Sequence, residues 1–447
     1  MRDLSEELLG DKQPKITDSI DMIKKIILWT IAVLVLLVIV AWGGYILRQQ
    51  ESYKSLVHKK SKALLTVSLD DILLNQFFNK WQSAPKEGQD FGKKLSKLKD
   101  NGIDIKANVF LFALEPHPKN FYAFFQLKDK QQFLNFLKDV IQVGAVESNL
   151  APDVSYAYHQ PSKIAFIWKG DDLLLSLGFD LDTKKEEMLQ LIQSKEDRIT
   201  IEQFISRPST LTGKSLRYSD ISTDNFIELD LKGDHVDVSG EFFSTDWNFP
   251  KEYLVRELVS AKYIGKAWIN IPNSQLKNQL KQLFSELPIA ADSIMAHLDG
   301  NYVDIEILKN KVIQADTIVN YAVDENFETI EEKTPYETKV PEVRLAMRGD
   351  SDMRRFLPSK LFYQWFQKQD NGFSLLTTSK DIDKLNVAYN KTAELSHVAV
   401  HLVDWPNEAK ISPILLLKTI ASDITVSLKV VDHNRLVLQG TIADYSH

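Results

Sequence analysis

The chain has 447 residues and a formal net charge of −7, with acidic and basic residues interspersed. No basic stripe with interleaved aromatic residues is present, which argues against a nucleic acid as partner. Cysteine is absent, which excludes disulfides and lipid attachment through cysteine. Only 17 glycines are present, and no phosphate-loop, dinucleotide or serine-nucleophile motif appears, so composition points to no cofactor.

The first long element is an uncharged apolar run of 21 residues, Ile26–Ile46. At about 1.5 Å per residue it matches the roughly 30 Å hydrocarbon core of a bilayer. It is too long for the core of a signal peptide, and no small-residue cleavage site follows it. We therefore predict a retained transmembrane helix over 26–47, with the membrane contacted through Ile26–Ile46.

The flanks of this run bear on the orientation of the chain. Lys24 and Lys25 directly precede it, which favours a cytoplasmic tail over 1–25. Residues 48–62 are then a juxtamembrane stalk, and the large C-terminal domain of an inner-membrane, single-pass protein lies outside the cytoplasm. Positive charges on the two flanks nearly balance, so the reverse orientation stays open.

A repeat at an offset of 200 residues organises the remainder. Leu98–Ile105 and Leu298–Ile305 share four identical positions, and Gly240 and Gly440 lie in similar predicted hairpins. We predict the fold class α+β, with two tandem units over 63–262 and 263–447. Each unit is an antiparallel sheet with helices packed on one face.

Alternating or short apolar runs predict the strands, and polar caps predict the helices. In the first unit the predicted strands are Leu64–Leu69, Asn108–Leu114, Phe121–Leu127, Val154–Tyr158, Lys163–Trp168, Leu173–Leu177, Phe226–Leu231 and Val236–Phe242. In the second unit they are Lys266–Ile271, Ile424–Val430 and Leu436–Ile442. Helices are predicted from Asp70, from Asp129, after Asn273 or Ser274, and up to Leu298.

Part of the first unit carries a resemblance. The run Gly102-Ile103-Asp104 precedes a strand hairpin, and Leu127-Lys128-Asp129 opens a helix containing Phe133 and Phe136. This pattern resembles a family of uncharacterised bacterial cell-envelope proteins that carry the unit in duplicate, over about 63–320. The resemblance implies an envelope location and brings no catalytic residues. Members are usually exported by a signal or lipoprotein sequence, whereas this chain carries an apolar run and no cysteine.

Candidate metal ligands are better explained by structure. His397 and His401 lie in a predicted strand, where residues four apart are about 13 Å from each other. Asp180, Asp182, Glu186 and Glu187 match a helix start better than a cation loop. Gly170-Asp171-Asp172 matches a hairpin turn, and Arg348-Gly349-Asp350 matches a strand end running into a helix. We predict no catalytic, cofactor-binding or metal-binding residue.

Two segments are candidate binding surfaces. Asp324–Glu342 carries seven acidic residues and two prolines, which predicts an exposed loop with a hypothetical docking role. The aromatic strand Phe121–Phe125 is typical of a core, although an apolar ligand pocket is possible there.

These observations give two functional hypotheses. The first is a membrane-anchored envelope protein whose duplicated extracytoplasmic domain is a non-catalytic binding or scaffold module for other envelope proteins. The alternative is a membrane-anchored hydrolase with scattered Ser, His and Asp residues. A pocket with a histidine in hydrogen-bond reach of both a serine and a carboxylate favours the hydrolase.

Overall fold

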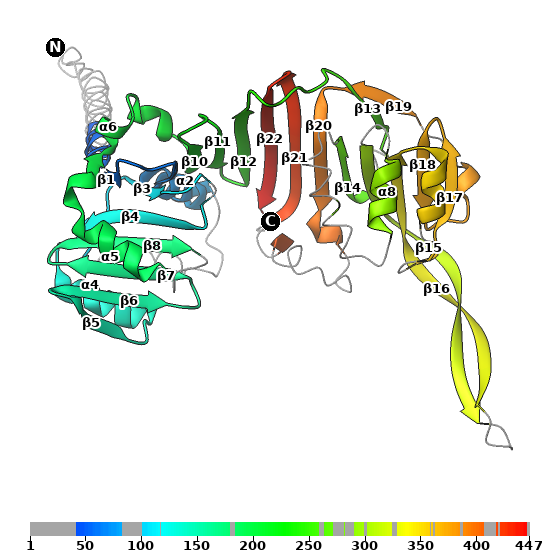
Figure 1. The fold of residues 1–447 in the computed structure, drawn as a ribbon, viewed down its shortest axis with the longest axis horizontal. Coiled ribbons are helices and arrows are strands. Elements are labelled where there is room, and N and C mark those ends of the chain that lie inside the picture. Colours follow the sequence, from blue (N-terminus) through cyan, green and yellow to red (C-terminus); the bar gives the residue numbers. More distant parts are fainter. Residues whose placement is uncertain are drawn as a thin grey trace, which may run out of the picture.

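The computed structural model describes residues 42–82, 101–116, 118–178, 184–258, 263–270, 281, 290–298, 302–323, 329–357, 359–360, 363–384, 388–405, 417–418 and 421–444. Strand accounts for 52% of the structure and helix for 22%. The predicted α+β class is therefore wrong: the molecule is mostly β, built on one large antiparallel sheet (Figure 1).

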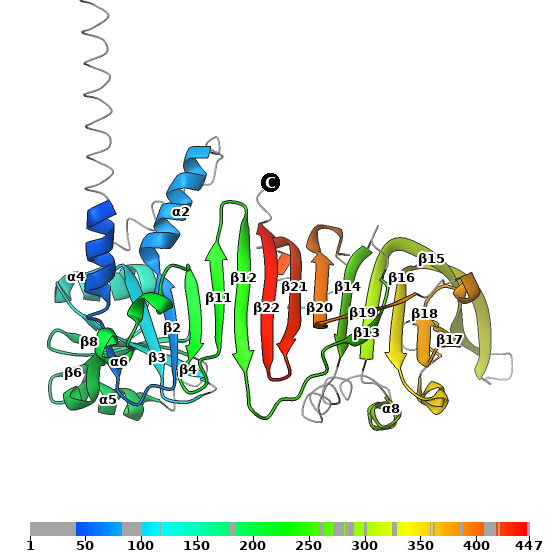
Figure 2. The ribbon, with the colours of Figure 1, turned by 90° about the horizontal axis from the view of Figure 1, so that it is seen from above.

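That sheet has 18 strands and runs from one end of the molecule to the other (Figure 2). The first ten in spatial order are β5 (Val146–Ala151), β6 (Val154–His159), β7 (Ile164–Lys169), β8 (Asp172–Gly178), β4 (Asn120–Gln126), β3 (Asn108–Ala113), β2 (Ala63–Ser68), β10 (Leu216–Asp220), β11 (Phe226–Leu231) and β12 (His235–Phe243). The next eight are β22 (Arg435–Asp444), β21 (Ala421–Asp432), β20 (Glu394–His401), β14 (Tyr263–Asn270), β15 (Tyr302–Val323), β16 (Thr329–Arg348), β18 (Phe373–Thr377) and β17 (Phe366–Asp370).

The two halves of the sheet have the same strand order. Outward from the centre, one half reads β12-β11-β10-β2-β3-β4-β8-β7, and the other reads β22-β21-β20-β14-β15-β16-β18-β17. Each half also has a separate strand pair: β1 (Leu56–His58) with β9 (Arg198–Thr200), and β13 (Tyr253–Arg256) with β19 (Tyr389–Thr392). This shared order favours a duplication, while the unit boundaries at 63–262 and 263–447 stay a prediction.

The halves join through their equivalent strands, β12 and β22. Ser239 lies opposite Gln439, the residue 200 positions further along the chain, so the antiparallel pairing has local two-fold pseudosymmetry. Next to this pair, Gly240 lies against the neighbouring strand, where an added Cβ would be 2.7 Å from Phe226 O. At Gly440 an added Cβ would be 2.5 Å from Thr425 O, so both glycines are required by close backbone approach.

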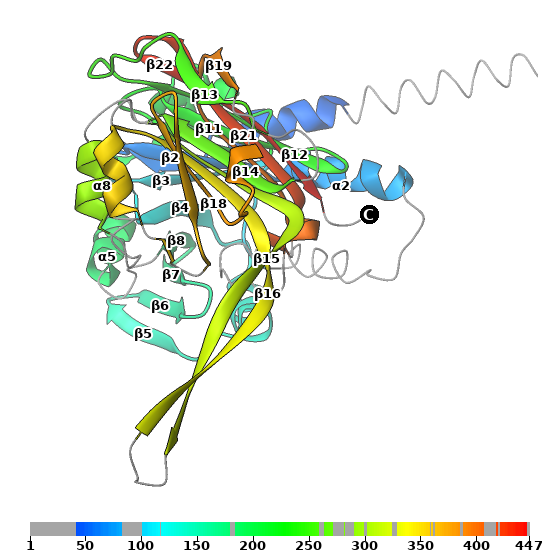
Figure 3. The same ribbon diagram turned by 90° about the vertical axis from the view of Figure 1, so that its right-hand side faces the viewer.

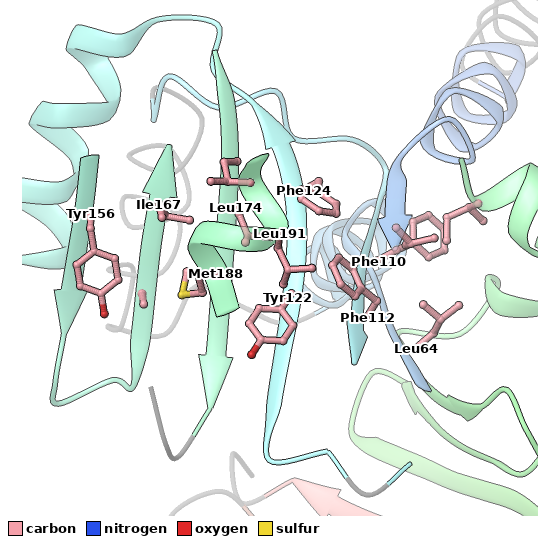
Figure 4. Packing of buried hydrophobic residues seen from close by; sticks show 14 of the residues in the cluster. Leu64, Phe110, Phe112, Tyr122, Phe124, Tyr156, Ile167, Leu174, Met188 and Leu191 are labelled. Atoms are coloured by element: carbon pink, nitrogen blue, oxygen red, sulfur yellow. The ribbon is translucent and has the colours of Figure 1, made fainter. Parts of the chain in front are cut away.

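In the first half, layers cover both faces of the sheet. Strand β1 and helices α5 (Lys185–Gln193) and α6 (Ile201–Phe204) contribute Val57, Met188, Ile192 and Ile201 to one core (Figure 4). Helix α4 (Lys130–Phe136) packs Phe133 against the opposite face. Successive residues of β7 serve the two cores alternately, as the pleat of a strand requires.

The second half repeats this layering with different elements. Helix α8 (Ala291–His297) packs Ile294 and Met295 against Met347 on one face. On the opposite face, Val255 of β13 contacts a core that includes Tyr302 and Phe373. The strand pair β13–β19 therefore has the same role in this half as β1–β9 has in the first.

Most predicted elements of the first half are confirmed to within a residue or two. Asp129 caps α4, and its carboxylate accepts hydrogen bonds from the backbone N–H groups of Gln131 and Gln132 at 2.8 and 3.0 Å. Helix α2 (Leu69–Gln82) begins one residue before Asp70, which lies in the first turn and pairs with Arg48 instead of capping. The helix predicted after Asn273 or Ser274 lies outside the described residues.

The predicted single-pass, inner-membrane architecture is contradicted. Among the residues that the structure describes, no helix is both long and apolar enough to cross a bilayer. Of the predicted span and its tail, 1–41 lie outside the described residues, and 42–52 form a helix that contacts the folded unit. Tyr45 donates a hydrogen bond to Asp71 at 2.6 Å, and Arg48 pairs with Asp70 at 2.8 Å.

The segment predicted as a juxtamembrane stalk, 48–62, is part of the fold. It contains β1, whose Val57 is fully buried in the core of the first half. Strand β1 pairs with β9, from Leu56↔Thr200 to His58↔Arg198. This pairing joins the segment to a strand more than 130 residues away along the chain. Sequence patterning missed β1 because it has only three residues.

Candidate functional site

The hairpin of β15 and β16 leaves the sheet and projects from the molecule (Figure 3). On one side, β14 pairs with β15 only as far as Leu308; on the other, β18 pairs with β16 only from Arg344 onward. Beyond these points, as far as the described residues show, the two strands pair only with each other, from Lys311↔Pro341 to Val323↔Thr329. We call this two-stranded part, 311–323 and 329–341, the arm.

An irregularity in pairing marks where the arm begins. Ile307 pairs with Val343, but the next pair is Lys311 with Pro341, so three residues of β15 lie opposite one residue of β16. Such bulges bend a strand pair and increase its twist. The bulge therefore directs the arm away from the plane of the sheet.

A buried glutamine fixes the base of the arm. Gln314 is 2% exposed, and its amide donates to Gln364 O at 2.9 Å and to Thr378 O at 2.7 Å. Its carbonyl oxygen accepts a hydrogen bond from Gln364 N at 2.9 Å. Nearby, Lys360 pairs with Asp316 at 2.8 Å, and this hydrogen bond lowers the pKa of Asp316. An isolated two-stranded ribbon is marginally stable, so these bonds hold the arm in its direction.

A buried ion cluster holds the sheet end of the same hairpin. Arg256 of β13 donates to Asp304 at 2.9 Å and to Glu306 at 2.9 Å, and both carboxylates are fully buried. Tyr302 donates to Asp304 at 2.7 Å and accepts from the backbone N–H of Arg256 at 3.0 Å. Burial acts to lower the pKa of Arg256, but the hydrogen bond to Asp304 and the two negative charges outweigh it and raise that pKa. The cluster joins β13 to the hairpin across the layers.

The surface of the arm mixes apolar and charged side chains. Ile313, Val319 and Tyr336 are 53%, 40% and 40% exposed. Pro335 and Pro341 occupy β16 and remove N–H groups that would otherwise point outward from the ribbon, which disfavours pairing with a further strand. The arm is therefore suited to contact through its side chains rather than through its backbone.

The segment predicted as an acidic exposed loop, Asp324–Glu342, is mostly strand. Thr329–Glu342 belongs to β16, and 324–328 lie outside the described residues. The prolines favoured a loop in the sequence, but both are tolerated because neither has to donate to the partner strand. Of its seven carboxylates, Glu331, Glu332 and Glu337 lie on the arm together with Lys333 and Lys339, Glu342 adjoins the arm, and the other three lie outside the described residues.

The sequence candidates for metal binding lie apart. His397 and His401 are on β20; His397 contacts Ser427 Oγ at 2.8 Å, whereas His401 contacts Asp423. Glu186 and Glu187 lie in the first turn of α5, while Asp180 and Asp182 are outside the described residues. In the part of the chain that the structure describes, no group of three His, Asp or Glu residues is arranged to hold a metal ion.

The remaining sequence motifs have structural roles. Gly170 adopts φ +60° in the turn between β7 and β8, as predicted. Arg348 ends β16, and Asp350 caps the 3₁₀ helix Ser351–Phe356 by accepting from Met353 N at 3.1 Å. Across the described ranges, no histidine is hydrogen-bonded to both a serine and a carboxylate, which was the arrangement expected of a hydrolase.

Comparison of the chain with models of protein families, with curated proteins and with solved structures finds no match. The resemblance to a duplicated cell-envelope family is therefore untested and stays a prediction.

Proposed function

We propose that this protein is a non-catalytic binding module that engages a protein partner through the arm. The observation that carries the proposal is the arm itself, a rigidly based hairpin that extends beyond the sheet with apolar side chains exposed. Exposed Tyr and Ile side chains beside charges are typical of protein interfaces, where a few such anchors provide most of the binding energy.

The charge of the arm specifies the chemistry of the partner. By sequence, the segment from Lys311 to Pro341 carries seven carboxylates and three lysines, which gives it a net negative charge. A basic surface on the partner is complementary to it and accelerates encounter, in a manner that weakens as salt is added. Ile313 and Val319 lie on one face of the arm and provide the apolar centre of the contact.

The test removes the outer part of the arm, which includes Val319 and Glu331, and leaves its base intact. Asp316 and Tyr336 are directly opposite each other, so an Asn-Gly turn replacing Thr317–Pro335 can join them as a two-residue hairpin. We expect proteins with a basic surface to be retained from cell extract by the full chain and lost with the truncated chain. The retained fraction falls between about 50 and 500 mM salt as charges are screened.

A charge-reversal pair separates recognition from folding. The double variant E331K/E337K alters exposed positions on the arm and should lose the same proteins. E196K, an exposed position in the other half, should retain them. Equal retention by the full chain, the truncated chain and E331K/E337K would exclude the arm as the binding element.

A further inference from the structure

A gap interrupts the sheet between β3 and β4. The two strands pair at Phe112↔Tyr122, and the next contact is the bridge Ile103↔Leu127. Between these two points, the eight residues 104–111 face only the four residues 123–126. The longer segment must therefore bow away from β4, and the ends of the bow are closed, since Asp104 N donates to Gln126 O at 2.8 Å.

The bow leaves a cavity of about 210 Å³ that is partly open to solvent. Phe110 lies on the bowed strand and Phe124 on the straight one (Figure 4), with Val109 and Phe125 beside them. This volume is smaller than the roughly 300–1,000 Å³ of drug-sized sites, which suits a small molecule. Aromatic and aliphatic side chains thus provide an apolar lining on both sides of the gap.

The polar lining carries an excess of positive charge. Lys54, Lys106 and Arg198 border the cavity together with Asp104 and Asp172. Each of these cations already has a carboxylate partner, but cations outnumber carboxylates: Asp104 pairs with Lys106 and Lys128, Asp172 pairs with Lys195 and Arg198, and Lys54 pairs with Glu51.

Arg198 is the most buried of these cations, with a side chain 5% exposed. Its guanidinium lies 4.5 Å from the centre of the Phe124 ring and donates to Ile192 O at 2.6 Å. Its Nε is buried without a hydrogen-bond partner. Buried polar atoms are rarely left unpaired, so Arg198 keeps an unused hydrogen-bond donor behind the lining.

We propose that this cavity binds a small organic anion with an apolar body, such as an aromatic or aliphatic carboxylate. The acid group lies toward Lys54 and Lys106 with Arg198 behind it, and the apolar body lies between Phe110 and Phe125. This site is independent of the arm, so neither proposal depends on the other.

The test compares phenylacetate with neutral phenylacetamide and with inorganic phosphate, by calorimetric titration and by the melting temperature of the full chain. A ligand that binds only the folded state raises the melting temperature as its concentration rises. We expect phenylacetate to bind and to raise the melting temperature, and the other two probes to have no effect. No binding of phenylacetate, or equal binding of the amide or of phosphate, would overturn the proposal.

Two variants and a control locate the site. K106Q removes a charge-assisted contact and should weaken phenylacetate binding about tenfold. V109W fills the gap and should abolish binding while the chain still melts cooperatively. K169Q, an exposed lysine at the end of β7, should bind like the unaltered protein. Undiminished binding by V109W would show that phenylacetate is held elsewhere and exclude the cavity.

Discussion

The hairpins β3–β4 and β15–β16 occupy the same place in the strand order of their halves, yet they are built in opposite ways. In the second half, pairing is continuous from Val303↔Met347 to Ile307↔Val343 and then extends into the arm. In the first half, the corresponding hairpin opens at its base and leaves a cavity that is partly open to solvent. One strand order therefore supports an extended projection in one half and a cavity between strands in the other.

Equivalent aspartates in the two halves also have different surroundings. Asp104 and Asp304 are 200 positions apart, and the identical pattern Asn-x-x-Asp-Ile surrounds both. At Asp104 burial acts to raise the pKa, but Lys128 and Lys106 outweigh it and lower the pKa. At Asp304 deeper burial dominates and raises the pKa despite Arg256. The closed hairpin thus depends on a buried charge partner, which the open hairpin does not need.

The largest effect is expected at Arg256. R256M leaves Asp304 and Glu306 buried without a cation, which should lower the free energy of unfolding by about 3–5 kcal/mol in urea denaturation. R48M removes only the ion pair with Asp70, in which the Arg48 side chain is 58% exposed, and should cost less than about 1 kcal/mol. Similar losses in the two variants would show that the buried cluster does not hold the closed hairpin.

A somewhat smaller loss is expected from Q314A. It removes three hydrogen bonds to buried backbone groups and should cost about 2–4 kcal/mol. Hydrogen exchange should accelerate in the arm and stay unchanged in β3 and β4. Q367A, which removes one bond to Leu357 O at 3.2 Å, is the matched control. Unaltered exchange in the arm of Q314A would mean that its direction is fixed by other contacts.

The two glycines at the centre provide a direct comparison of the halves. G240A and G440A each place a Cβ against a backbone carbonyl of the adjacent strand, so each should cost about 1–3 kcal/mol. G144A, where an added Cβ meets nothing within 4 Å, should be near neutral. A large difference between the stability losses of G240A and G440A, measured by thermal unfolding, would show that the two strands are not equivalent.

The smallest effect is confined to acid. Because the pKa of Asp104 is lowered in the folded state, its contribution to stability is present above its ordinary pKa and is lost as the pH falls through the lowered value. Unfolding measured below about pH 4 should therefore depend less on pH in D104N than in the unaltered chain. Parallel pH profiles would show that the lysines do not stabilise the charged form.

Local patterning predicted the individual strands well, but not how far they extend or how they combine. Alternation located β11, β12, β21 and β22, since each has a half-buried face. It missed most of β15 and β16, because the arm has no core to impose alternation and two prolines suggested a loop. The predicted α+β class failed for the same reason: long strands occupy a region where a loop was expected.

The candidate sites depend on contacts that local sequence does not display. Tyr302, Asp304 and Glu306 alternate along one strand, which signals a buried polar face, but nothing in the sequence identifies Arg256 as the partner 48 residues away. The gap between β3 and β4 depends on an unequal number of residues between two pairings. The Phe-rich strand was correctly assigned to the core, and two of its aromatic residues also line the cavity.

The central pairing of β12 with β22 has a consequence for assembly. The equivalent edge strands of the two halves pair there around a local two-fold axis, as in an isologous dimer. The same edge of each half is therefore occupied by the other half. Joining unlike edges head to tail would instead leave a growing end and allow open-ended polymers. The like-to-like connection therefore leaves only the unlike outer strands, β5 and β17, as edges of the described sheet.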